Sequence, residues 1–209
     1  MKLTLNALAT ALLLSTSASA LAASTVDLTV KGVITPNACT PGLSGGGMVD
    51  YGKISAKDLN LTTPKQLPRT TLQLTITCDG GTLFAVKGTD NRAGSNSSGG
   101  TYGLGLINGT QKLGTYDLML NNAVADSVAI TVLESGDNGT TWAESADAIL
   151  PPSALAAFGD RTSGTWLPVP IQQVVSDLVV YAQIARADSL DLSDEHPIDG
   201  SATLEVKYL

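Results

Sequence analysis

The sequence predicts an all-β protein built as an antiparallel β-sandwich. Two observations lead to this prediction: apolar and polar residues alternate along most segments that follow residue 22, and Gly, Asn, Asp, Ser and Pro separate these segments. Alternation places every second side chain on the same face of a strand, and the separating residues are those that tight turns require. The pattern therefore favours a two-layer antiparallel sandwich.

The individual strands follow from the same alternation. It is clear in five stretches: "TVDLTVKG" (25–32), "TTLQLTITC" (70–78), "TYDLML" (115–120), "SVAITVLES" (127–135) and "ATLEVKYL" (202–209). The stretch "DLVVYAQIA" (177–185) is apolar on both faces, which is typical of a central strand. One helical turn is expected, in "PPSALAAFGD" (151–160), after two prolines.

The first residues predict export. Residues 1–22 have a positive start, an apolar run around 12–14 and small residues with Ala20 and Ala22 in an A-x-A arrangement. This is the pattern of a cleaved secretory signal peptide, which is too short for a membrane anchor. No later stretch approaches the roughly 20 apolar residues of a membrane-spanning helix.

Composition restricts the function further. The chain has 19 acidic and 12 basic residues and a formal net charge of −7, without a basic patch, so a nucleic-acid partner is not expected. An exported chain with two cysteines, Cys39 and Cys78, is expected to pair them. Two cysteines and the single histidine, His196, make no convincing zinc site.

One short motif raises the question of catalysis. "SGDNGTTW" (135–142) resembles the Asp-box, a hairpin motif repeated in sialidase-type β-propellers. Only one copy is present, and the chain is too short for a six-bladed propeller. A glycosidase would also need a pair of carboxylates at a cleft, which the sequence does not place. We therefore expect a structural turn and a protein that is not an enzyme, with no catalytic residue, cofactor or metal.

The two ends of the mature chain carry a family resemblance. "VKGVITPNAC" (30–39) has a seven-residue step from Gly32 to the first cysteine, the second cysteine closes the strand "LQLTITCDG", and the sequence ends in an alternating strand with a penultimate tyrosine. In this order the features resemble the pilin subunits of chaperone–usher fimbriae. Within that family the chain is most similar to a larger fimbrial-like branch that has a domain of unknown function.

The resemblance implies a fold and a division of the chain. Pilins are incomplete immunoglobulin-like sandwiches that lack the seventh strand and are completed by a donor strand from a neighbour. The implied division is a signal peptide (1–22), a donor-strand extension (23–34) and a pilin-like domain (35–209). A complete seven-stranded sandwich would show the same alternation, so the residues alone leave both forms open.

The resemblance also implies partners and residue roles. The resemblance implies a structural subunit that is exported through the periplasm to a surface fimbrium and mediates adhesion. Its partners would be a periplasmic pilus chaperone, an outer-membrane usher and neighbouring subunits. The carboxylate of Leu209 would anchor the chaperone. The implied donor side chains are Val26, Leu28 and Val30. The implied groove-edge side chains are Ala202, Leu204, Val206 and Tyr208.

A second function is kept beside this one. The chain is longer than a typical shaft pilin, and the surplus falls in residues 90–112 and 134–166. These insertions contain Tyr102, Trp142 and Trp166, which are candidate contacts to a glycan or receptor. The alternative is therefore a minor or tip-proximal adhesive subunit, although core packing would also explain these three aromatic residues.

Overall fold

The computed structural model of the chain describes residues 28–32, 38–99 and 102–209. The chain divides into two compact units, Met1–Ile34 and Thr35–Leu209. The signal segment and Val26 lie outside the described residues. None of the helices in the described part has the length and apolar character needed to cross a membrane.

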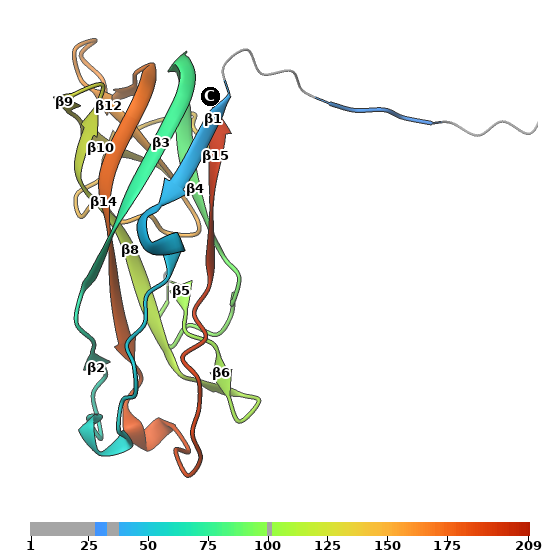
Figure 1. The fold of residues 1–209 in the computed structure, drawn as a ribbon, viewed down its shortest axis with the longest axis vertical. Helices are drawn as coiled ribbons and strands as arrows, with labels where there is room; N and C mark the ends of the chain where they lie inside the picture. Colours follow the sequence, from blue (N-terminus) through green and yellow to red (C-terminus); the bar gives the residue numbers. More distant parts are fainter. Residues whose placement is uncertain (1–27, 33–37, 100–101) are drawn as a thin grey trace, which may run out of the picture. The chain divides into compact units, whose positions relative to one another are not determined.

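The second unit is an immunoglobulin-like β-sandwich of two antiparallel sheets (Figure 1), which confirms the predicted fold class. The first sheet has the spatial order β1 (Cys39–Leu43), β3 (Thr70–Thr82), β14 (Ile171–Ile184), β8 (Gly114–Ala125) and β5 (Tyr102–Gly103), with β2 (Lys65–Gln66) paired to β14 and β9 (Val128–Ala129) paired to β8. The second has the order β11 (Ala143–Glu144), β10 (Thr131–Ser135), β12 (Leu155–Asp160), β4 (Phe84–Asp90) and β15 (Ala202–Tyr208), with β13 (Leu167–Pro168) paired to β12.

Short elements connect the sheets. A small hairpin pairs β6 (Leu106–Ile107) with β7 (Gln111–Lys112), and the short 3-10 turns are η1 (Ser44–Gly47), η2 (Ala56–Asp58) and η3 (Ala187–Ser189). Three consecutive glycines in η1 have positive φ, between 60° and 74°. Most other residues avoid this conformation, so the glycine run allows the chain to turn sharply at the end of β1.

The longest strands follow the pattern that the sequence predicts. On β3, the residues that point into the core are buried at every second position, Leu72, Leu74, Ile76 and Cys78, whereas the residues between them are exposed or half-buried. β14 runs between β3 and β8 and buries residues on both of its faces. Its position confirms the central strand expected at residues 177–185.

The helical turn expected at residues 151–160 is wrong. Residues 151–154 form a turn in which the Ala154 N–H donates to the Pro151 carbonyl at 3.2 Å, and Leu155–Asp160 form β12, which pairs with β10 on one side and β4 on the other. Its first five residues, Leu155–Gly159, are all buried. Alanine-rich sequence favours a helix locally, but the central position in a sheet covered on both faces overrides this weak preference.

The main core lies between the two sheets. Phe84 and Phe158 meet edge to face with ring centroids 6.2 Å apart, and Tyr102 stacks on Tyr116 at 5.1 Å. Burial of such large apolar groups is the main favourable term in the folding of a sandwich. The core therefore fixes the two sheets face to face and determines which of their edges lie beside each other.

Candidate functional site

Two edge strands border the candidate site, one from each sheet. β1 is the last strand of the first sheet and pairs with β3 alone, while β15 is the last strand of the second sheet and pairs with β4 alone. Among the described residues, no strand pairs with the outer edge of either. An unpaired strand edge presents backbone N–H and C=O groups that another strand can bind.

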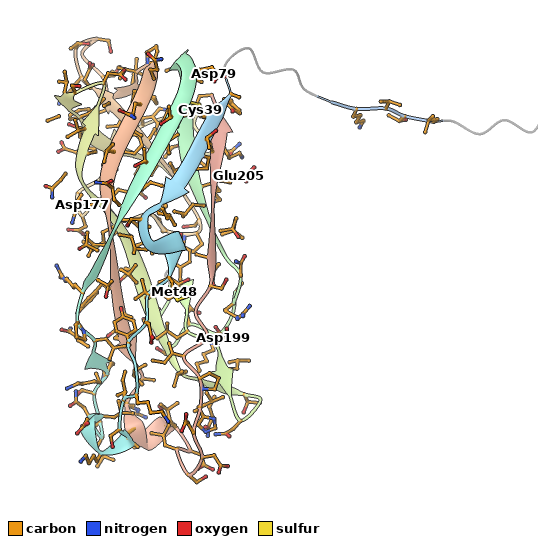
Figure 2. All side chains as sticks on the ribbon, in the orientation of Figure 1. Cys39, Met48, Asp79, Asp177, Asp199 and Glu205 are labelled. Carbon is orange, nitrogen blue, oxygen red and sulfur yellow. A yellow bond between two sulfur atoms is a disulfide. The ribbon has the colours of Figure 1, made fainter. Side chains whose placement is uncertain are left out.

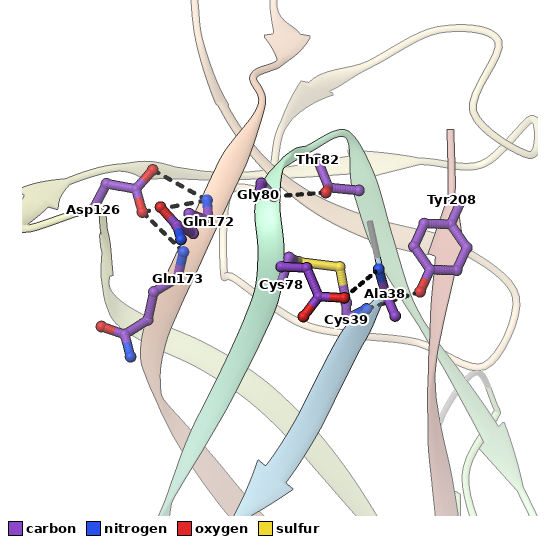
Figure 3. Close-up of a disulfide and its surroundings, with 10 residues drawn as sticks. Ala38, Cys39, Cys78, Gly80, Thr82, Asp126, Gln172, Gln173 and Tyr208 are labelled. Atoms are coloured by element: carbon purple, nitrogen blue, oxygen red, sulfur yellow. Dashed lines mark hydrogen bonds between the residues drawn. A yellow bond between two sulfur atoms is a disulfide. The ribbon is translucent and has the colours of Figure 1, made fainter. Parts of the chain in front are cut away.

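A single hydrogen bond joins the two edges at one end (Figure 3). The Cys39 backbone N–H donates to the Tyr208 hydroxyl at 2.9 Å. Cys39 is also bonded to Cys78, directly opposite it on β3, so the predicted disulfide is confirmed. The tyrosine thus ties the end of β15 to the disulfide-bonded start of β1, and the space between the edges is bounded at this point.

Away from this end, the two edges enclose a groove, which we call the edge groove. One wall is residues 43–54, which continue from β1, and the other is residues 192–204, which lead into β15. Met48 and Asp199 mark where the walls extend beyond the two strands (Figure 2). The walls carry half-buried apolar side chains that pack against the main core: Leu43, Val49, Tyr51, Ile198, Ala202 and Leu204.

The floor of the edge groove is the core itself. A cavity of about 250 Å³ lies between the walls near β15, and its floor is formed by side chains of β3, β8 and β14 and the residue after β5: Leu72, Leu104, Tyr116, Leu118, Leu178, Val180 and Ala182. In a closed sandwich such residues lie beneath another strand. Apolar side chains inserted between the walls would therefore reach the centre of the core.

The groove continues into a second cavity of about 450 Å³, whose lining includes charged side chains. Val49, Tyr51 and Ile198 line both cavities, so the two are contiguous. The rim of the second cavity contains Asp50, Asp194, Glu195, Lys53 and His196, of which Lys53 and Glu195 form an exposed ion pair at 3.3 Å. The groove therefore changes from an apolar end at β15 to a charged end.

The entry to β15 is fixed by an arginine and a glycine. Arg92 donates to both carboxylate oxygens of Asp199, at 2.9 and 2.7 Å, and this hydrogen bonding lowers the pKa of Asp199. A Cβ at Gly200 would lie 3.0 Å from Leu104 Cδ2 and 3.1 Å from Tyr116 Cε1. A larger residue at this position would push the Leu104 or Tyr116 side chain aside by a few tenths of an ångström, so glycine favours the close approach of the backbone to the groove floor.

The residues that the resemblance assigns to the groove edge lie on β15. Ala202 and Leu204 line the edge groove, Val206 packs against the main core, and Tyr208 makes the bond to Cys39. Of the implied donor residues, Leu28 and Val30 are 88% and 86% exposed, and Val26 is outside the described residues. The side chains of Leu28 and Val30 thus each present nearly their whole apolar surface to water.

The Asp-box motif forms a hydrogen-bonded turn between β10 and β11. Asp137 accepts from the Ser135 hydroxyl at 2.7 Å and from the Thr141 backbone N–H at 2.9 Å with Oδ1, and from the Thr141 hydroxyl at 2.7 Å with Oδ2. Ser135 in turn accepts from the Gly139 N–H, and Gly139 has a φ of 91°. The carboxylate is thus occupied by the turn that contains it.

The same hydrogen bonds, with those from Thr141 first, lower the pKa of Asp137 to about 2. Because the folded pKa lies below the unfolded value of about 3.9, ionised Asp137 stabilises the fold above pH 4, and this contribution is lost as the pH falls through 2. We expect Asp137→Asn to be less stable than the parent at pH 6, and the difference to disappear between pH 4 and 2. Urea unfolding of both proteins across this range measures it; a difference independent of pH would contradict the assignment.

The three aromatic residues proposed as receptor contacts occupy different environments. Tyr102 is 1% exposed, stacks on Tyr116 and donates to the Leu150 carbonyl at 2.8 Å. Its ring belongs to the core, where it offers no surface to a receptor. Trp142 is half-buried against Ala85, Leu155 and Ala157, and Trp166 is half-buried just before β13.

The described residues contain no group of three or more His, Cys, Asp or Glu side chains arranged to hold a metal ion. The one histidine, His196, is half-buried, and its Nε2 lies 3.1 Å from the Asp191 carbonyl oxygen. The most distinctive surface feature is thus the edge groove and not a cluster of ionisable groups.

The sequence is similar to a protein family and to two proteins of known sequence. Residues 28–111 match a family model described as "Protein of unknown function (DUF1120)". That segment contains both cysteines, β1, β3 and β4, but not β15. Two proteins of Escherichia coli (strain K12) match over more of the chain. Protein GltF is 29% identical over 233 residues, covering 92% of each protein, and the uncharacterized protein YhcF is 29% identical over 224 residues, covering 91% of this chain and 93% of its own length.

Sequence reasoning did not identify most of the groove. It singled out β15 but missed the opposite wall and the floor, including Leu43, Leu72, Leu118 and Leu178. A local signal was present in "MVDYGKI" (48–54), where Val49 and Tyr51 alternate with polar residues. The floor residues gave no separate signal, because a side chain beneath an open groove and one beneath a covering strand have the same sequence pattern.

Proposed function

We propose that this protein is a structural subunit of a surface fimbria, completed and joined to its neighbours by a strand that fills the edge groove. The observation that carries the proposal is the groove itself: two unpaired edges from opposite sheets, with the core between them as its floor. An added strand would pair with β15 through backbone hydrogen bonds and place alternate side chains on the floor.

The proposed occupant is residues 23–34 of a second copy or of a similar subunit. In that segment Val26, Leu28 and Val30 alternate with polar residues, so they share one face of an extended strand. Burial stabilises such a contact by roughly 25 cal/mol per Å² of apolar surface. The exposed Leu28 and Val30 side chains and the half-buried apolar side chains of the groove walls would lose contact with water in the same step.

The other parts of the proposal follow from the two unpaired strand edges and the half-buried apolar walls between them. Before assembly, a subunit with an exposed groove would aggregate through its strand edges, which is the reason to propose a periplasmic pilus chaperone as a temporary occupant and an outer-membrane usher as the place of exchange. Export through the periplasm to the cell surface rests on the signal-like residues 1–22.

We propose a structural, non-enzymatic role for this subunit in preference to receptor binding or glycoside hydrolysis. The core position of Tyr102 and the packing of Trp142 against Ala85, Leu155 and Ala157 support this preference, since both aromatic side chains have a structural role. The occupied carboxylate of Asp137 supports it as well.

The test is to produce the mature chain, residues 23–209, in a bacterial periplasm with and without a pilus chaperone. We expect recovery as a chaperone complex, and a synthetic peptide of residues 23–34 should displace the chaperone and raise the melting temperature. A peptide with Leu28→Asp should fail, while the matched Thr29→Asp peptide, changed on the opposite face, should still bind. A stable free monomer that is indifferent to the peptide would contradict the proposal.

A further inference from the structure

The Asp-box hairpin contacts the end of β15, about 70 residues further along the chain. A Cβ at Gly139 would lie 3.5 Å from Leu209 Cδ2 and 3.6 Å from Trp142 Cζ2, so the turn lies directly against the Leu209 side chain. Beside this contact, Lys207 Nζ donates to Asn138 Oδ1 at 3.5 Å. Two residues of the turn, Asn138 and Gly139, therefore lie beside Lys207 and Leu209, which share one face of the strand end.

A small apolar cluster supports the turn from below. Trp142 packs against Ala85, Leu155 and Ala157. Their sequence neighbours Val86, Ala156 and Phe158 belong to the main core, and adjacent strand residues point to opposite faces, so the cluster lies on the outer face of the second sheet. Leu155 also lies beside Gly139, where a Cβ would be 3.8 Å from Leu155 Cδ1. The cluster, the turn and Leu209 are thus in continuous contact.

The end of β15 needs such support because it has few other contacts. The strand pairs with β4 alone, and its ladder ends with the Leu209 N–H donating to the Leu83 carbonyl at 3.1 Å. The end of an edge strand with one neighbour opens easily. On the inner face Tyr208 is held by the Cys39 N–H, and on the outer face Lys207 and Leu209 are held by the hairpin.

We propose that the Asp-box hairpin is a positioning element for the end of β15. Asp137 and Ser135 hold the turn in shape, Trp142 anchors it to the outer face of the sheet, and Gly139 and Asn138 hold Leu209 and Lys207 in place. Because Ala202 and Leu204, at the other end of β15, belong to one wall of the edge groove, the hairpin also helps to set the edge on which an incoming strand pairs. This second consequence rests on the proposed function, whereas the positioning of β15 does not.

The primary test measures amide hydrogen exchange by NMR in the mature chain. Asp137→Ala and Trp142→Ala should accelerate exchange of the Leu209 amide roughly tenfold, the change that 1.4 kcal/mol of local opening free energy gives. Asp160→Ala is the matched control. Asp160 is also an aspartate that accepts from a turn N–H, that of Thr162 at 2.9 Å, but its turn lies between β12 and β13. It should leave Leu209 unchanged.

The outcome that overturns the positioning role is specific. If the Thr141 amide exchanges faster in Asp137→Ala, so that the turn has opened, while the Leu209 amide is unchanged, the hairpin only covers the sheet. A fall in Leu209 protection in the Asp160→Ala control would equally overturn it, because the effect would then come from general destabilisation.

The effect of the hairpin on strand binding in the edge groove is tested by peptide affinity. Leu209→Ala and Trp142→Ala should each weaken binding of the residue 23–34 peptide several-fold, and the double variant should be no weaker than either single variant, since both act through one contact. Additive losses, or faster Leu209 exchange with unchanged affinity, would overturn the link. If the parent binds no peptide, the proposed function fails, and the exchange data still decide the positioning role.

Discussion

Replacing Leu204 with aspartate is expected to prevent filling of the edge groove, lowering affinity for the residue 23–34 peptide by roughly a hundredfold or more. Leu204 lines the apolar cavity and packs against the main core from β15. A strand inserted beside it would bury the new carboxylate without a partner, which is among the most costly substitutions at an interface. Isothermal titration of the peptide into the mature chain, or into its chaperone complex, measures the loss.

Thr203→Asp is the matched control, since Thr203 is the preceding residue of β15, is exposed and points to the other face. It introduces the same charge on the same strand and should change the affinity little. Equal losses in both variants would show that charge on β15, and not occupation of the groove, determines binding. An unaffected Leu204→Asp protein would show that the peptide binds elsewhere.

Removing the disulfide is expected to have the largest effect on stability. Cys39 and Cys78 are 39 residues apart in sequence, and closing a loop of this size contributes about 4 kcal/mol in the chain-entropy treatment. β1 is only five residues long and pairs with β3 alone, so the bond also fixes one wall of the groove. Urea unfolding of Cys39→Ala/Cys78→Ala against the parent should show a loss of 2–5 kcal/mol, the usual range for removal of a native disulfide.

The parent protein under reducing conditions is the control for the alanine substitutions, because it keeps both sulfur atoms and loses only the bond. It should lose most of the same stability and should also bind the residue 23–34 peptide less tightly, since β1 would be less firmly held. A reduced parent as stable as the oxidised one would contradict the prediction.

Much of the fold is predictable from the sequence because strand alternation is local. The runs at 70–78 and 202–209 specify which side chains lie inside and outside, and β3 and β15 follow them. The run at 177–185 predicts a central strand, and β14 is one. The helical expectation fails at residues 155–160 because the local preference is weak, and pairing with β10 and β4 decides their conformation.

The candidate site is less predictable because it consists of long-range contacts. The sequence indicated Ala202, Leu204 and Tyr208 through a resemblance, but no pattern joins them to Leu43, Leu72 or Leu178. These residues meet only because β1 pairs with β3, β15 pairs with β4, and the two sheets then pack face to face. The contact between Gly139 and Leu209 is of the same kind.

By itself, the sequence determined the class of the fold, the faces of its main strands, the cysteine pair and the turn at residues 135–142. Each of these depends on residue spacing within one segment or on the count of one residue type. Only the tertiary structure decided which strand edges stay unpaired, that a cavity lined by core residues lies between them, and that the Asp-box turn lies beside the end of β15. Those features depend on which distant segments become neighbours, and this is set by the packing of the two sheets as a whole.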